Sequence, residues 1–179
     1  PSPLKDFSMV SWNTRALYRT GSSHDCILGR RKLAHVQSLV SNFDIVCLQE
    51  VHGDQWSMEQ LLEPLAGKCD IFVNPFSSSP HFEPNSCGDE ILGSLKGDDK
   101  SGGTVILVAK HSSRGIHVKH TIHVPGRVHT LNLSREGHTV LIGNVHNHGI
   151  AETLMSSFHD FICDEISQCT ALPHSKALF

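Results

Sequence analysis

The chain has 179 residues, of which 39% are hydrophobic and 18% are charged, and its formal net charge is −3. This composition is typical of a globular protein with a sizeable core, and the charge argues against a surface that is basic throughout. No apolar run approaches the length of a membrane span, and no segment has the pattern of a signal peptide. We therefore expect one domain, residues 1–179, located inside the cell in the nucleus or the cytoplasm, with no membrane partner.

The first half of the chain alternates between strand and helix patterns, which predicts a crossover unit within a sheet. Asp54 is a suitable N-cap for the second of the two helices. The basic run Arg30-Arg31-Lys32 lies outside the apolar stripe of the first helix, so we interpret it as a solvated helix face. The expected elements are strands at residues 7–12, 44–49 and 69–73 and helices at residues 27–42 and 55–65.

The second half is dominated by strands. It is preceded by residues 74–101, which are rich in Ser, Pro, Gly and Asp and which we expect to form a long loop or insertion. Helices on the outside of a mostly antiparallel, multi-stranded core predict the α/β fold class, arranged as a sandwich. The expected elements are strands at residues 103–110, 116–124, 128–133 and 138–146, a helix at 151–168, and a further strand that begins at 176.

Cysteine and histidine are numerous, but neither has the spacing of a metal site. The six cysteines include no CxxC pair, and we expect reduced thiols. The fourteen histidines include His117, His120 and His123, which would share one face of a helix. The surrounding residues alternate as a strand, however, and a strand turns His120 away from the other two. We therefore expect no zinc site there.

The segment Asp44–Gly53, DIVCLQEVHG, is apolar on both faces until it ends on Gln49 and Glu50. A continuous apolar run is typical of a strand in the middle of a packed sheet. A carboxylate at the end of such a buried strand needs a partner for its charge, and a hard divalent cation is a suitable partner. A lone glutamate at a strand end is also explained by simple exposure to water. Two further expected strands end on polar residues, Asn13 and His146, and the three ends together favour a site.

Four motifs occur in a fixed order: SWN at 11–13, DIVCLQE at 44–50, GGTVILVAK at 102–110 and NVHNHG at 144–149. In this order they resemble the endonuclease/exonuclease/phosphatase superfamily, which includes DNase I, exonuclease III-type apurinic-site endonucleases, sphingomyelinases and inositol-phosphate phosphatases. The amino-acid sequences of these motifs are most similar to those in the endonuclease domains of LINE-type retrotransposons. The resemblance extends from Phe7 to Phe179.

The resemblance implies a four-layered α/β sandwich of DNase I-like type and metal-assisted hydrolysis of a phosphodiester, with DNA as the partner. It assigns catalytic roles to Asn13, which orders the metal carboxylate, and to His146, which contacts the scissile phosphate. Glu50 would bind Mg²⁺, with Mn²⁺ as an alternative. Asn144 and Asn147 would bind substrate. Many retrotransposon enzymes have Tyr where His146 stands, so the subfamily stays open.

Two family motifs, Gly-Asp-x-Asn and a terminal Asp-His pair, do not occur in the 179 residues. We therefore expect the chain to be the N-terminal part of such a domain. Without the base that the first motif supplies, this part alone should be slower by a factor of about 10²–10⁴. The alternatives are a non-catalytic remnant or binding module of the same fold, and a phosphodiesterase for phospholipids or inositol phosphates.

Overall fold

The computed structural model describes residues 7–17, 23–76, 102–147, 150, 152–171 and 176–178. The loop expected at 74–101 therefore lies outside the described residues, apart from residues 74–76. No helix in the described part of the chain is long and apolar enough to cross a membrane.

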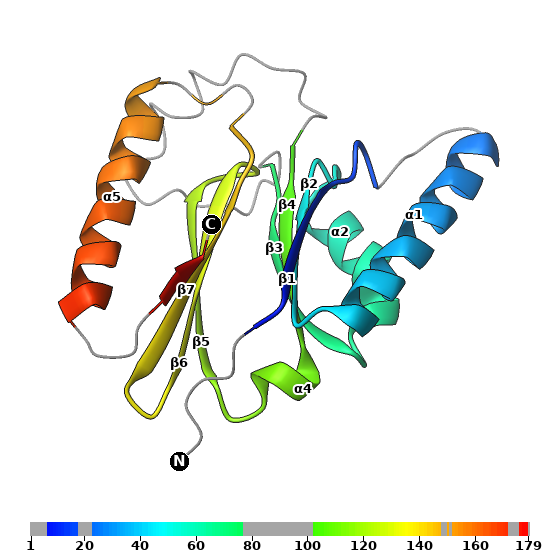
Figure 1. Ribbon diagram of the computed structural model, residues 1–179. Coiled ribbons are helices and arrows are strands. Elements are labelled where there is room, and N and C mark those ends of the chain that lie inside the picture. The colour runs from blue at the N-terminus through cyan, green and yellow to red at the C-terminus, as the bar shows by residue number, and fades with distance from the viewer. Residues whose placement is uncertain are drawn as a thin grey trace.

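The described residues form two sheets that lie face to face, with helices on their outer faces (Figure 1). Sheet A has the strand order β1-β2-β4-β3, and sheet B has the order β5-β6-β7-β8. Helices α1 and α2 cover sheet A, and α5 covers sheet B, which gives the expected four-layered α/β sandwich (Figure 1). The elements are β1 Met9–Asn13, α1 Ser23–Asn42, β2 Ile45–Gln49, α2 Gln55–Leu62, the 3-10 helix η1 Glu63–Leu65, β3 Cys69–Asn74, β4 Thr104–Ala109, α4 Lys110–Ser113, β5 His117–Val124, β6 Val128–Arg135, β7 His138–Val145, α5 Glu152–Ala171 and β8 Lys176–Leu178.

The predicted elements are confirmed with shifts at their ends. β1 and β2 pair in parallel around α1, as the crossover unit requires, and β8 pairs in parallel with β7. The helix expected to run to residue 65 ends at Leu62, and Pro64 lies in the 3-10 turn that follows. The short helix α4 was not predicted. This single turn is held by tertiary contacts, because His111 and Ser112 both hydrogen-bond to Asp44. No local sequence pattern predicts a helix of this kind.

Strand β2 is buried on both faces, which explains its continuous apolar sequence. Val46 and Leu48 pack into the core beneath the helices, whereas Ile45 and Cys47 pack into the core between the two sheets. Burial raises the pKa of the Cys47 thiol to about 12, so this cysteine stays a protonated, apolar side chain. Cys47 and Cys69 are both free thiols, in line with the expectation of reduced cysteines.

The side chain of Asn144 ties the two sheets together. It is 1% exposed on β7, and its Nδ2 donates to the carbonyl oxygens of Leu48 at 3.1 Å and Val105 at 2.9 Å, on β2 and β4. Its Oδ1 accepts a hydrogen bond of 2.7 Å from Nε2 of Gln49. Asn144 thereby satisfies buried polar groups of two strands in the opposite sheet.

We expect Asn144→Leu to lower the free energy of unfolding by roughly 2–5 kcal/mol, since it leaves several buried polar groups without partners. Urea denaturation followed by circular dichroism measures the change. Asn132→Leu makes the same substitution at a half-buried position of β6 and should cost less than about 1 kcal/mol. Equal costs for the two variants would contradict the role given to Asn144.

Candidate active site

Three strand ends meet at one edge of the sandwich and bring Asn13, Glu50 and His146 together. Nδ2 of Asn13, at the end of β1, lies 3.0 Å from Oε1 of Glu50, which follows β2. Nε2 of His146, which follows β7 in the other sheet, lies 3.1 Å from the same oxygen. The sequence predicted these three residues as a site, and the structure places them in direct contact.

The Glu50 carboxylate is held in its ionised form. The hydrogen bond from Asn13 is the largest cause that lowers the pKa of Glu50; the hydrogen bond from His146 acts in the same direction, and burial opposes both. Asn13 is itself oriented, because its Oδ1 accepts a hydrogen bond of 3.0 Å from the backbone N–H of Arg15. The side chain of Glu50 is 28% exposed, so the carboxylate remains open to a ligand.

Glu50 reaches this position through a left-handed backbone conformation, with φ of 52°. In a regular strand, adjacent side chains point to opposite faces. Here Gln49 and Glu50 both reach residues of sheet B, because the backbone turns between them. Arg15, Ala16 and His52 also have positive φ, so four residues without the freedom of glycine adopt this costly conformation beside the site.

Hydrogen bonds hold these strained segments in place. The Thr14 hydroxyl donates to the carbonyl oxygens of Gln49 at 3.0 Å and Glu50 at 2.8 Å, and the N–H of Ala16 donates to Glu50 O at 2.8 Å. The ammonium group of Lys32 reaches across from α1 and donates to three consecutive carbonyl oxygens, those of Thr14, Arg15 and Ala16, at 2.6, 2.6 and 3.1 Å. Arg30 and Arg31 are exposed as expected for a solvated face. Lys32 differs, since it fixes the loop after β1.

Arg127 was not anticipated from the sequence. It follows the Pro125-Gly126 turn between β5 and β6, is 2% exposed, and places Nη1 at 2.7 Å from Nδ1 of His146. Its guanidinium group also lies over the ring of Phe76, 5.7 Å from the centroid. The only signal in the sequence was the turn itself, which indicated a hairpin and gave no reason to select the arginine.

The two remaining predicted residues lie in different surroundings. Asn144 is buried between the sheets, with its amide bonded to protein groups, and contacts Gln49 one residue before Glu50. Asn147 is exposed, one residue after His146. Neither is hydrogen-bonded to Glu50 in the part of the chain that the structure describes. Asn147 borders the site, and Asn144 lies beneath it.

The carboxylate oxygens of Glu50 suit a hard cation that keeps most of its bound water molecules. Both hydrogen bonds to Glu50 end on Oε1, and within the described ranges Oε2 accepts none. No group of three or more His, Cys, Asp or Glu residues that could hold a metal occurs among the described residues. One carboxylate oxygen with water and phosphate oxygens is the coordination that Mg²⁺ commonly takes beside a phosphate.

The histidines of β5 divide between two layers. His120 lies between the sheets, with Nε2 2.9 Å from Nδ1 of His129 and its ring against Phe72. His123 packs against Phe161 on α5. His120 thus turns away from His123, as the alternation of a strand predicts.

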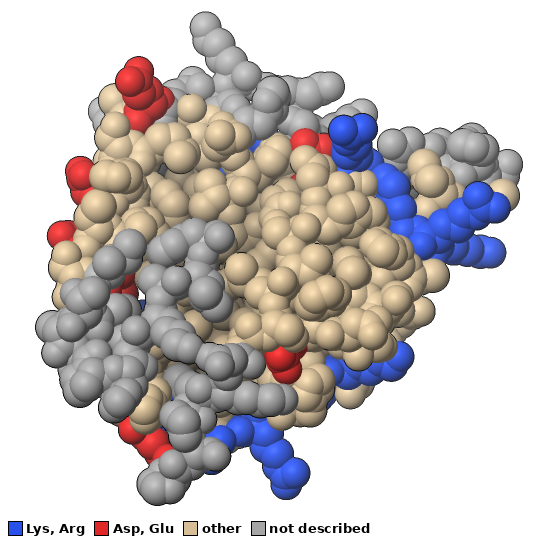
Figure 2. Space-filling model, viewed as in Figure 1, with Lys and Arg blue, Asp and Glu red and all other residues tan. Residues whose placement is uncertain are grey.

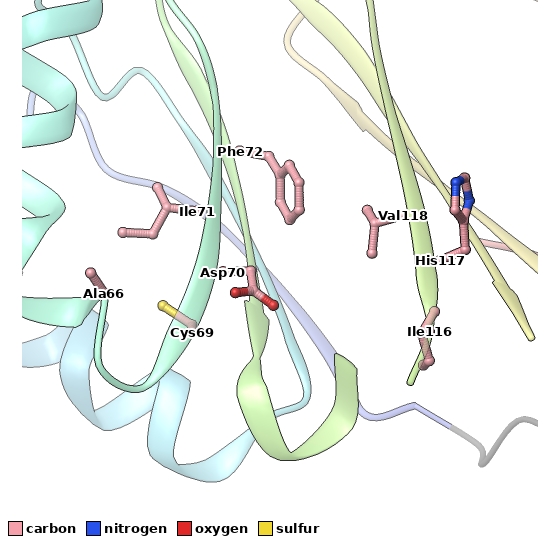
Figure 3. A pocket seen from close by; sticks show the side chains of 8 residues that line it. All are labelled: Ala66, Cys69, Asp70, Ile71, Phe72, Ile116, His117 and Val118. Atoms are coloured by element: carbon pink, nitrogen blue, oxygen red, sulfur yellow. The ribbon is translucent and has the colours of Figure 1, made fainter. Parts of the chain in front are cut away.

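A separate cavity of about 610 Å³ opens between the edge strands β3 and β5 (Figure 3). Phe72 and Val118 project toward each other across it (Figure 3). Asp70 of its wall is in register with Val108, which is in register with Ile45 at the start of β2. The cavity therefore lies at the opposite end of sheet A from Glu50 and is not part of the site.

We expect Lys32→Met to lower the free energy of unfolding by about 1.5–3 kcal/mol, because a charged donor to three carbonyl groups is lost. Arg31→Met removes an exposed charge from the same helix turn and should change stability by less than about 0.5 kcal/mol. Chemical denaturation of both variants makes the comparison. A cost for Lys32→Met no greater than that for Arg31→Met would mean that the ammonium group contributes nothing to holding the loop.

The sequence of the chain matches the model of one known protein family. A model of the endonuclease/exonuclease/phosphatase family matches residues 10–165. No curated protein matches the sequence.

Several solved structures are similar to this chain at low sequence identity, and those with a TM-score of 0.50 or more share its fold. TDP2 from C. elegans is 22% identical, with a TM-score of 0.47 over 92% of this chain and 43% of that one. AP endonuclease LMAP from Leishmania major is 14% identical, with a TM-score of 0.50 over 78% and 40%. A β-hairpin deletion mutant of beta toxin from Staphylococcus aureus is 14% identical, with a TM-score of 0.54 over 89% and 62%. This chain therefore spans less than two thirds of each of these proteins. Since the family model covers most of its length, the chain belongs to the endonuclease/exonuclease/phosphatase family.

Proposed function

We propose that this chain is the N-terminal part of a divalent-cation-dependent phosphodiesterase that nicks DNA, in a protein of retrotransposon type. The observation that carries the proposal is the meeting of Asn13, Glu50 and His146 around one carboxylate oxygen. These side chains come from the ends of three strands, and Glu50 is held there despite its left-handed backbone. Strain that the surrounding structure maintains is common at functional sites.

Each side chain has a distinct role in this proposal. The Glu50 carboxylate would hold Mg²⁺ or Mn²⁺, and the cation would stabilise the charge that develops on the phosphate and leaving oxygens. Asn13 fixes the orientation of Glu50 and faces the phosphate. His146 donates to a phosphate oxygen, and the exposed Asn147 contacts substrate beside it. Asn144 contributes from below, since it positions Gln49 and the two strand ends.

DNA is proposed as the substrate because the sequences of the four motifs resemble those of LINE-type endonuclease domains. A DNA substrate implies a location in the nucleus or the cytoplasm. The AP endonuclease of L. major is by name a nuclease with this fold. On the face seen in Figure 2, Lys and Arg side chains gather around α1 and along one edge, and most of the face carries neither. Because Arg30 and Arg31 on α1 are exposed, a local basic patch is available to a phosphate backbone even at a net charge of −3.

The general base is assigned to residues outside this sequence. The chain covers 43%, 40% and 62% of the three structures compared above, and the Gly-Asp-x-Asn and Asp-His motifs are absent from its 179 residues. We accordingly place the described residues in one incomplete domain. The same absence favours a second candidate, a non-catalytic remnant or binding module with this fold.

A plasmid nicking assay with Mg²⁺ tests the proposal and separates the two candidates. The chain extended past Phe179 to include the missing motifs should nick supercoiled DNA, and chelation with EDTA should abolish the reaction. Glu50→Gln should reduce the rate by at least about 10²-fold, because an interaction that stabilises developing charge is lost. Asn132→Ala, on β6 away from the site, should leave the rate unchanged.

An extended protein that never nicks DNA would support the remnant or binding module. Nicking that is unaffected by Glu50→Gln would refute the assignment of the metal. Hydrolysis of a phospholipid or an inositol phosphate in the same assay series, without nicking, would refute DNA as the substrate.

A further inference from the structure

The imidazole ring of His146 has a partner on each nitrogen. Nδ1 lies 2.7 Å from Nη1 of Arg127, and Nε2 lies 3.1 Å from Oε1 of Glu50. The His146 side chain is 11% exposed and the Arg127 residue 2%, so both contacts are largely shielded from water.

The chemistry of the two partners determines where the ring carries its proton. An arginine guanidinium group has five N–H donors and no acceptor, and it stays protonated in proteins. Nη1 of Arg127 therefore donates, and Nδ1 of His146 must accept with its lone pair. A neutral imidazole has one donor and one acceptor, so the proton is on Nε2, where it points at the Glu50 carboxylate.

We propose that Arg127 is a positioning residue that holds His146 as the neutral, Nε2-protonated tautomer, so that the ring acts as a hydrogen-bond donor and not as a base. The role of this donor in catalysis rests on the proposed function, in which a phosphate oxygen binds beside Glu50 and within reach of the Nε2–H group. With Nδ1 engaged by Arg127 and Nε2 protonated, the ring has no free lone pair with which to take a proton from water. The base must accordingly come from another residue.

Arg127 is fixed firmly enough to perform this role. Its carbonyl oxygen accepts a hydrogen bond of 2.8 Å from the N–H of His146, so the two residues are linked through backbone as well as side chain. The preceding Gly126 donates its N–H to Oδ1 of Asn74, a fully buried residue, at 2.9 Å. A Cβ at Gly126 would lie 2.8 Å from Phe76, the residue whose ring supports the guanidinium group. The turn is therefore specific for glycine and aims Arg127 at His146.

Nitrogen-15 NMR of the histidine rings in the uniformly labelled 179-residue chain, at neutral pH, tests the inference. The signals of His146 are assigned as those that disappear in His146→Gln. We expect Nδ1 of His146 to be unprotonated and Nε2 to carry the proton. Arg127→Met removes the donor and should give a mixture of tautomers or a protonated Nδ1. Arg127→Gln keeps an N–H donor and should restore the original pattern, while Arg135→Met, an exposed arginine on β6, should leave it unchanged.

A protonated Nδ1 in the unaltered chain would overturn the inference, whatever the variants do. A ring spectrum that is identical in Arg127→Met and in the unaltered chain would also overturn it. The first result needs no variant to fold, and the backbone amide spectrum reports whether Arg127→Met has folded. The nitrogen-15 measurement requires neither metal nor substrate, so its outcome is independent of the nicking assay. An unexpected tautomer with successful nicking would overturn this inference alone, and failed nicking with the expected tautomer would overturn the proposed function alone.

Discussion

The site depends on the distance between the two sheets, and Asn144 is the side chain that sets it. From β7 its amide bonds to the backbones of β2 and β4 and to the side chain of Gln49. Nearer the ends of the strands, a second contact joins the sheets, between His146 and Glu50. His146 lies two residues after Asn144, and Glu50 follows Gln49 directly. A buried amide that must satisfy three partners permits little sliding of one sheet over the other, so the contact between His146 and Glu50 is held in register.

The space between the sheets changes character along its length. At the start of β2 it is filled by apolar side chains such as Ile45 and Val108. Toward the site it contains polar side chains: Nε2 of His120 lies 2.9 Å from Nδ1 of His129, and Nε2 of His129 lies 3.3 Å from Nδ2 of Asn144. Burial, together with the neighbouring histidines, lowers the pKa of His129 to about 3, so this fully buried ring stays neutral and serves as structure. The polar part of the core thus supports the strand ends without adding charge beneath Glu50.

The sequence predicted the strands and their ends well because burial and alternation are local patterns. Asn13, Glu50 and His146 were predicted as a candidate site because each lies at the end of an expected strand, and the structure brings the three residues into contact. Residues that act through the tertiary structure were missed. Arg127 lies in a turn whose pattern indicates only a hairpin, and Lys32 belongs to a basic run that resembles any solvated helix face. The left-handed backbone of Glu50 has no sequence signature either, since glutamate carries no preference for it.

Asn13, Glu50 and His146 are proposed to form one site for a divalent cation beside a phosphate. Paramagnetic broadening by Mn²⁺ of the backbone amide signals of this chain tests it most directly. Broadening centred on the residues that follow β1, β2 and β7, and lost in Glu50→Gln, is the predicted result. Broadening centred on the histidines of β5 or α5, or a pattern that Glu50→Gln leaves unchanged, would contradict it.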